Sequence, residues 1–114
     1  MSRTKIKQSS SNFFADVYDV VRLVPKGRVT TYGAIGQYLG MKSSARMVGW
    51  PMYGCPRDVF VYCVVNSAGL LTGKHHFKPP RAMQQRLEKE GIRVVKDKVQ
   101  NFKVHFWNPS EELL

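Results

Sequence analysis

Two cysteines and three histidines are the first side chains of this sequence to consider as nucleophiles, general bases or metal ligands. Seven residues lie between Cys55 and Cys63, and a tetrahedral zinc site would need His75, His76 or His105 to join them. The C-x7-C spacing matches no zinc pattern. His75 and His76 are adjacent, an arrangement that rarely chelates one metal well, and we expect both histidines in a loop. We therefore expect structural, partly buried thiols, with no metal and no cofactor.

Positive charge is the strongest signal in the composition. Eighteen Lys and Arg against eight Asp and Glu give a formal net charge of +10, and the pI is about 10.0. Both halves of the chain are basic, because residues 1–58 carry nine bases and three acids and residues 59–114 carry nine and five. Such a basic folded domain favours nucleic acid as its partner over a role of the charge in solubility alone.

The length and hydropathy of the chain exclude several classes of protein. A chain of 114 residues, 43% hydrophobic and 23% charged, forms one globular domain and has no room for a large enzyme or a two-domain cofactor protein. It lacks any apolar run of about 18 residues, so no membrane association is expected, and its polar start is unlike a secretory signal. We expect a cytoplasmic protein associated with the nucleoid, or a nuclear protein in a eukaryote.

Hydrophobic periodicity predicts three helices in the first half of the chain. Apolar side chains recur at helical spacing over residues 13–24, with Asp16 outside the stripe. A second helix is expected to begin after the N-cap residue Thr31 and to end at Gly40, and a third to cover residues 43–49. Two short helices joined by a tight turn with glycine are typical of a helix-turn-helix motif.

The second half of the chain predicts a smaller β component. A β-branched and aromatic run over residues 59–65 predicts a buried strand, and two prolines predict a helix over residues 79–90. Alternating apolar residues predict a hairpin of strands 92–95 and 102–106. The expected fold class is mainly α with small β, a winged helix-turn-helix-like domain. We divide the chain into a flexible basic arm (1–11), a single domain (12–108) and a C-terminal tail (109–114).

Four motifs stand in series along the chain. They are Pro25-x-Gly27-x-Val29-Thr30-Thr31-Tyr32-Gly33-x-Ile35, Ser44-Ala45-Arg46-x-Val48-Gly49, Val64-Val65-Asn66-Ser67-x-Gly69 and Leu87-x-x-Glu90-Gly91. Together they resemble the C-terminal, DNA-binding domain of the O6-alkylguanine-DNA alkyltransferases, over residues 13–95. The resemblance implies docking in the minor groove of duplex DNA and rotation of a damaged nucleotide out of the helix.

The same family transfers the alkyl group to a cysteine in a Pro-Cys-His-Arg-Val motif. Counting back from Gly69 places Val61 at the cysteine position, Tyr62 at the histidine position and Cys63 at the arginine position. Valine has no nucleophile and a neutral phenol cannot deprotonate a thiol, so the transfer reaction is predicted to be absent. Loss of the cysteine resembles the alkyltransferase-like proteins, which bind the lesion without repairing it but usually carry Trp or Ala followed by His-Arg.

The resemblance also implies roles for individual residues. Arg46 matches the arginine that fills the gap left by the rotated base, and Tyr32 matches the tyrosine that rotates the 3′ phosphate. Judged by spacing alone, Arg46 could instead be a solvated charge on a helix, and Tyr32 could be a core aromatic. The expected DNA contacts are Thr30, Thr31, Tyr32, Ser43, Ser44, Ala45, Arg46, Met47 and Gly49. The expected lesion pocket is lined by Tyr32, Val61, Tyr62, Cys63, Val64, Asn66, Ser67 and Lys74.

These observations favour a non-enzymatic monomer that binds O6-alkylguanine in double-stranded DNA, and the resemblance implies that it marks the lesion for the proteins of nucleotide excision repair. Two alternatives stay open. One is a winged-helix DNA-binding regulator without lesion specificity, which the altered residues 60–63 favour. The other is an alkyltransferase that uses Cys63, two residues along the predicted strand from Val61, as a displaced acceptor.

Overall fold

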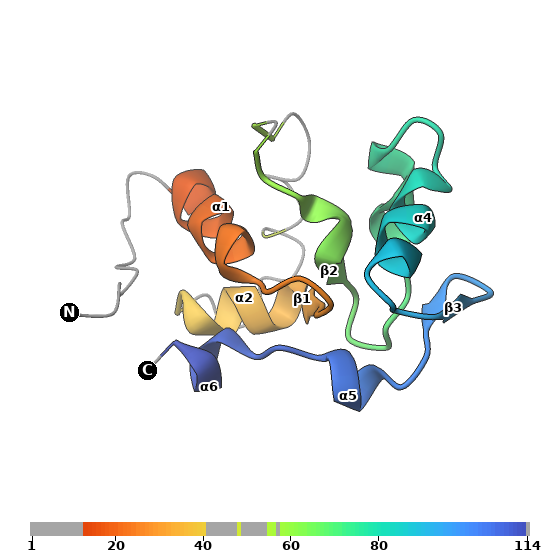
Figure 1. Cartoon of the computed structure of the whole chain (residues 1–114). Helices are drawn as coiled ribbons and strands as arrows, with labels where there is room; N and C mark the ends of the chain where they lie inside the picture. The colour runs from red at the N-terminus through yellow and green to blue at the C-terminus, as the bar shows by residue number, and fades with distance from the viewer. Residues whose placement is uncertain (1–12, 41–47, 49–54, 57, 114) are drawn as a thin grey trace.

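Short helices surround a very small central sheet in this protein, and the fold is mainly helical, as predicted. The computed structural model describes residues 13–40, 48, 55–56 and 58–113 (Figure 1). Helix α1 (Phe13–Leu23) lies above α2 (Tyr32–Tyr38) on one side, and α4 (Ala82–Lys89) lies on the other. Strands β1 (Thr30–Thr31) and β2 (Val64–Val65) lie between them. Within the described residues, no helix has the length and apolar character needed to cross a membrane.

The parallel pair β1–β2 lies between two hydrophobic clusters. Thr30 is opposite Val64 and Thr31 is opposite Val65. Because neighbouring residues of a strand point to opposite sides, Val64 packs with α1 and α2 whereas Val65 packs with α4. The buried members of the first cluster are Val17, Val20, Val21, Ile35, Leu39, Val48, Val59, Cys63, Val64 and Trp107. Those of the second are Val29, Val65, Leu71, Met83, Leu87, Ile92, Val94 and Val99.

Helices α1 and α2 form where the sequence predicts them. The side-chain oxygen of Thr31 accepts the N–H of Ala34 at 3.0 Å, which caps α2, and Gly40 follows this helix with a φ of 81°. The predicted stripe of α1 needs correction at two positions: Asp16 is buried and Phe14 is 44% exposed. A carboxylate in the first turn of a helix faces the positive end of the helix dipole, which favours its position there.

The predicted strand over residues 59–65 is wrong at its beginning. Val61–Cys63 form a 3-10 helix, η2, whose closing bond runs from the N–H of Val64 to the carbonyl of Val61, and only β2 pairs as a strand. The reason is that β1 is only two residues long, since Thr31 already caps α2. The residues before Val64 have no neighbouring strand and therefore bond locally.

The predicted hairpin is also shorter than expected. Strand β3 (Val94–Val95) pairs with β4 (Lys98–Val99) across a two-residue turn, in which Lys96 and Asp97 have φ values of 51° and 63°. Residues 102–106, expected as a strand, instead contain the short helix α5 (Phe102–His105). The rings of Phe102 and Phe106 stack 5.2 Å apart, at the spacing of neighbours on a helix face.

Helices α4 and α6 complete the domain. Helix α4 is shorter than the predicted range 79–90, but its inward residues Met83 and Leu87 are fully buried as predicted. The chain then runs beside β1, where the N–H of Val29 donates to the carbonyl of His105 and the N–H of Trp107 donates to that of Val29. The segment expected as a C-terminal tail contains α6 (Pro109–Glu112), which packs against α2.

Candidate functional site

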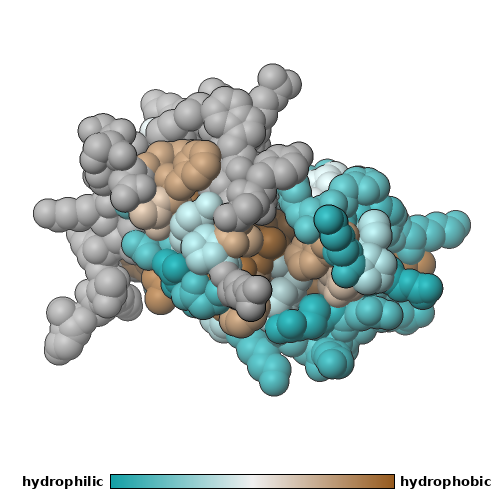
Figure 2. Space-filling view, turned by 90° about the horizontal axis from the view of Figure 1, so that it is seen from above, coloured by the Kyte–Doolittle hydropathy of each residue, from teal (hydrophilic) through white to brown (hydrophobic). Residues whose placement is uncertain are grey.

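A hollow of about 560 Å³ lies beside η2, and we call it the Val61 pocket. Its volume falls in the range of about 300–1,000 Å³ that is usual for ligand pockets. Seen from above, hydrophobic surface lies in the middle of the molecule, next to the hydrophilic side that carries α4 (Figure 2). The residues that line the pocket are Cys55, Pro56, Val59, Phe60, Val61, Tyr62, His76, Phe77, Ala82 and Arg86.

The structure brings only part of the predicted lesion pocket to this hollow. Val61 and Tyr62 line it, whereas Val64 is fully buried in β2 and Cys63 is only 6% exposed and belongs to the core. The cause is the 3-10 turn, in which successive side chains are rotated by about 120° rather than alternating between two faces. Val61 and Cys63 therefore point in different directions, whereas in a strand they would share one face.

Three further residues of the predicted pocket lie elsewhere. The side-chain oxygen of Asn66 accepts the N–H groups of Ala68 and Leu70, so that Asn66 builds the turn after β2. Ser67 lines a separate groove with Thr31, Gly33 and Gln37 at the start of α2, and we call it the Ser67 groove. Lys74 is paired with Asp97 in a third hollow.

Tyr32, predicted as a pocket residue, is not among the residues that line the Val61 pocket. Its hydroxyl lies against Gly73 of the 3-10 helix η3 (Thr72–His76), whose last residue does line the pocket. A Cβ atom at Gly73 would lie 2.7 Å from the hydroxyl oxygen of Tyr32 and 3.4 Å from Cδ2 of His76, so glycine permits this close approach. His76 itself lines the pocket. Burial, followed by the charge of His75, lowers the pKa of His76, which leaves its ring neutral at physiological pH.

The wall residue Tyr62 is held by two side chains at the end of α4. Its hydroxyl donates to the carboxylate of Glu90, whose other oxygen accepts the N–H of Gly27 at 2.7 Å. The guanidinium carbon of Arg86 lies 4.7 Å from the centre of the Tyr62 ring and 5.5 Å from that of Phe60. Burial, and then the Glu90 hydrogen bond and charge, raise the pKa of Tyr62 to about 12, so the phenol stays protonated.

Sequence reasoning missed Phe60, His76 and Arg86 as residues of the site. One signal was present for Arg86, because it precedes Glu90 by one helical turn and Glu90 belongs to a quoted motif. For Phe60 and His76 the sequence held no such signal, since their positions depend on two 3-10 turns.

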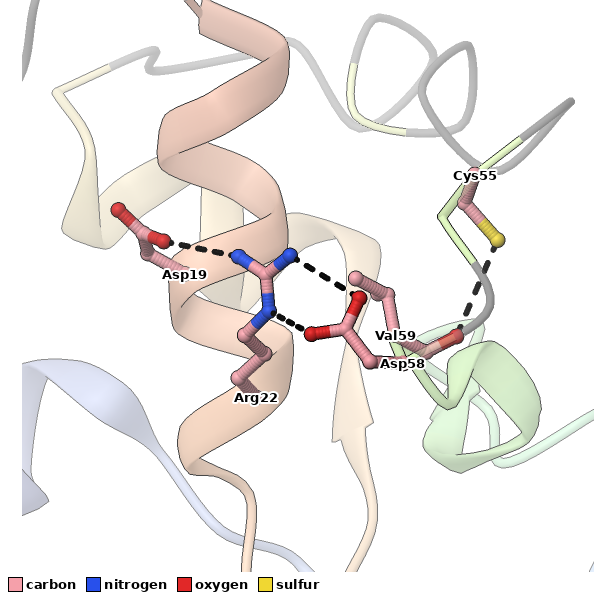
Figure 3. A network of polar contacts seen from close by, with 5 residues as sticks. All are labelled: Asp19, Arg22, Cys55, Asp58 and Val59. Atoms are coloured by element: carbon pink, nitrogen blue, oxygen red, sulfur yellow. Dashed lines mark hydrogen bonds and ion pairs between the residues drawn. The ribbon is translucent and has the colours of Figure 1, made fainter.

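An ion-pair network attaches the segment before η2 to α1 (Figure 3). The guanidinium of Arg22 contacts both carboxylate oxygens of Asp58, at 2.9 and 3.3 Å, and one oxygen of Asp19 at 3.0 Å. The hydrogen bond from Arg22 lowers the pKa of Asp58. Because Val59 and Cys55 flank Asp58 and line the Val61 pocket, this forked contact helps to position one wall of the pocket.

Cys63 is not placed to act as a nucleophile. Its thiol donates to the carbonyl of Phe60 at 3.3 Å, and burial raises its pKa to about 12. The thiolate, which is the reactive form, is therefore scarce at physiological pH. The structure thus argues against the alternative in which Cys63 serves as a displaced alkyl acceptor.

We expect a maleimide reagent at pH 8 to label Cys55 well before Cys63 in the folded protein. Burial raises the pKa of both thiols, but Cys55 is partly exposed, whereas Cys63 is buried with its pKa raised to about 12, so the thiolate of Cys63 is both scarcer and less accessible to the reagent. Mass spectrometry of tryptic peptides measures both rates, and unfolding in urea should make the two rates similar. Labelling of Cys63 as fast as Cys55 in the folded state would contradict this assignment.

The predicted DNA contacts divide into buried residues and residues that the structure does not describe. Thr30 is fully buried, and its hydroxyl has no hydrogen-bond partner among the described residues. Thr31 is also buried and caps α2, so that neither threonine side chain is exposed to contact a phosphate as predicted. Tyr32 is partly exposed. The expected contacts Ser43, Ser44, Ala45, Arg46, Met47 and Gly49 lie outside the described residues.

Comparison with known proteins places the chain in a family. Residues 12–92 match the model of the 6-O-methylguanine DNA methyltransferase DNA-binding domain. The chain is 33% identical over 103 residues to alkyltransferase-like protein 1 of Schizosaccharomyces pombe, a match that covers 85% of this chain and 95% of that protein. The chain belongs to the alkyltransferase-like proteins of this family. It is also 33% identical over 84 residues to a DNA base-flipping protein of Vibrio parahaemolyticus, covering 72% and 82% of the two chains.

Solved structures agree with this membership of the alkyltransferase-like proteins. S. pombe Atl1 in complex with damaged DNA containing O6-carboxymethylguanine superposes with a TM-score of 0.77 at 32% identity, over 89% of this chain and 99% of that chain. Mycobacterium tuberculosis OGT gives a TM-score of 0.61 at 25% identity, over 78% of this chain and 54% of that one. The predicted family and fold class are both confirmed.

Proposed function

We propose that this alkyltransferase-like protein binds duplex DNA at O6-alkylguanine and holds the everted base in the Val61 pocket without removing its alkyl group. The observation that carries the proposal is the position of Val61: the residue at the family's acceptor position lines a hollow large enough for a ligand. Among its relatives, S. pombe Atl1 was solved with DNA containing O6-carboxymethylguanine, and the V. parahaemolyticus relative is a DNA base-flipping protein.

Three features support binding without alkyl transfer. Val61 carries no nucleophile. Tyr62, at the position of the family's histidine, stays protonated, donates a hydrogen bond to Glu90 and is not available as a base toward a thiol. Cys63 is buried in the core. Because no covalent step occurs, the lesion stays bound and unrepaired. The protein acts as a monomer, and its complex with the lesion marks the site for the proteins of nucleotide excision repair.

Contacts to the DNA strand are expected beside η3, which the hydroxyl of Tyr32 approaches at Gly73. Thr31 acts indirectly in this proposal, because its cap fixes the start of α2 and with it the position of Tyr32. The exposed Ser67, in the Ser67 groove, supplies a hydroxyl donor to a backbone phosphate. Arg46 fills the space left by the everted base, while small Ala45 and Gly49, with Ser43, Ser44 and Met47, lie against the minor groove.

The proposal is tested by titrating the protein with two labelled duplexes of one sequence, one unmodified and one containing a single O6-methylguanine. We expect tighter binding to the modified duplex, because a damaged base is easier to evert and fits an apolar pocket. The methyl group, carried as a radiolabel, should remain on the DNA after prolonged incubation. Equal affinity for both duplexes would favour a DNA-binding protein without lesion specificity, and label on the protein would favour an alkyltransferase.

A further inference from the structure

We propose that a basic hollow next to the Val61 pocket binds a backbone phosphate of the strand that carries the everted base, and that Asp97 limits its affinity. This hollow, of about 290 Å³, lies between η3 and the β3–β4 turn. The residues that matter to its chemistry are Thr72, Lys74, His75, Lys96 and Asp97. The inference rests on the proposed function, because it extends the DNA contact beyond the lesion itself.

The helix η3 connects the two hollows. His76 at its end lines the Val61 pocket, whereas Thr72, Lys74 and His75 line the basic hollow. Gly73, between them, lies against the hydroxyl of Tyr32. A DNA strand whose base occupies the Val61 pocket must leave that pocket along one of its borders, and at this border the same five-residue helix carries Lys74 and the side-chain donors Thr72 and His75.

The donors of the basic hollow suit a phosphate group. Lys74 and Lys96 provide ammonium groups, Thr72 provides a hydroxyl and His75 provides a ring N–H, all of which donate to phosphate oxygens. Thr72, His75 and Lys96 are exposed. Such contacts add affinity without reading the sequence or the lesion, because every nucleotide presents the same phosphate.

The two sides of the basic hollow are held together by the backbone. The N–H of Leu71, just before η3, donates to the carbonyl of Asp97 at 2.9 Å. The two-residue turn places Lys96 and Asp97 next to each other at its tip, both at positive φ. Lys96 therefore stays close to η3 even though it lies 20 positions beyond the end of that helix.

Asp97 neutralises one of the cations in the free protein. Its carboxylate lies 2.6 Å from the ammonium of Lys74, and the side chains are 47% and 32% exposed. A phosphate and this carboxylate compete for the same ammonium group, and the negative charge of Asp97 repels the phosphate. Asparagine removes that charge and still accepts the left-handed backbone conformation of the turn.

The test is a salt series of anisotropy titrations with the O6-methylguanine duplex and its unmodified counterpart. We expect Lys96→Gln and Lys74→Gln each to weaken binding to both duplexes and to reduce the slope of log affinity against log salt by about 1. Asp97→Asn should strengthen binding to both duplexes, and most of this gain should disappear in a Lys74→Gln background. Lys89→Gln and Glu88→Gln, exposed on α4, are controls with the same changes in charge.

The increase in affinity expected for Asp97→Asn cannot result from misfolding, because a misfolded domain would lose affinity for DNA. Effects no larger than those of the α4 controls would overturn the proposal. So would a loss of lesion preference in the Lys74→Gln or Lys96→Gln proteins, since a phosphate contact weakens both duplexes equally. Failure of the proposed function has a different signature, namely a wild-type protein that binds both duplexes equally.

Discussion

Replacing Arg46 with alanine is expected to remove the preference of the protein for an O6-methylguanine duplex over an unmodified duplex. In the proposed function its planar guanidinium stacks in the space of the everted base and bonds to the orphaned cytosine. Eversion costs a few kcal/mol, and about 1.4 kcal/mol corresponds to a tenfold change in affinity, so the preference should fall by at least about tenfold. Anisotropy titrations of the two duplexes measure this ratio directly.

Arg46→Lys is the matched control for charge. Lysine keeps the positive charge but lacks the flat, forked group, so this variant should keep its affinity for the unmodified duplex and still lose most of the lesion preference. An equal loss of affinity for both duplexes in Arg46→Ala would instead identify Arg46 as a phosphate contact. That result would contradict its proposed role in stabilising the everted base.

Glu90→Ala is expected to lower the free energy of unfolding by about 2–4 kcal/mol. The carboxylate of Glu90 accepts the hydroxyl of Tyr62 and the N–H of Gly27, and its removal leaves both partly buried donors without an acceptor. It thereby disconnects the turn after α1 from the wall of the Val61 pocket. Urea unfolding followed by circular dichroism measures the change.

Two comparisons distinguish the loss of the Glu90 hydrogen bonds from a general effect of mutations at the end of α4. Glu88→Ala, exposed on α4, should change stability by less than about 0.5 kcal/mol. In a double-mutant cycle, Tyr62→Phe should cost less in a Glu90→Ala background than in the wild type, because its partner is already absent. Equal losses in Glu88→Ala and Glu90→Ala, or strictly additive effects in the cycle, would show that Tyr62 and Glu90 are not coupled.

Local signals in the sequence predicted α1, α2 and α4, whereas α5 and α6 were not predicted as helices. The side-chain oxygen of Thr31 caps α2 as expected, and Gly40 and Gly91 end their helices at positive φ. These features involve residues within a few positions of each other, so their physics is visible in a short window of sequence. The motifs likewise identified the family, because they preserve the turns and caps in series.

The strands were predicted less well, because a strand needs a partner from another part of the chain. The run over residues 59–65 has the composition of a buried strand, yet only Val64 and Val65 find a partner in β1. Phe102 and Phe106 fitted an alternating pattern, but the hairpin closes earlier at Lys96 and Asp97 and leaves them to form a helical turn.

The sequence by itself determined the basic charge, the family and the prediction that Val61 stands at the acceptor position, because each of these depends on residue types in order along the chain. Only the tertiary structure decided which side chains surround Val61 and which do not. In the folded protein Cys63 is buried in the core and Lys74 is paired with the carboxylate of Asp97. Arg86 and His76, from distant segments of the chain, line the pocket. The physical reason is that a 3-10 turn and a strand present the same residues in different directions, and the availability of a neighbouring strand selects between them.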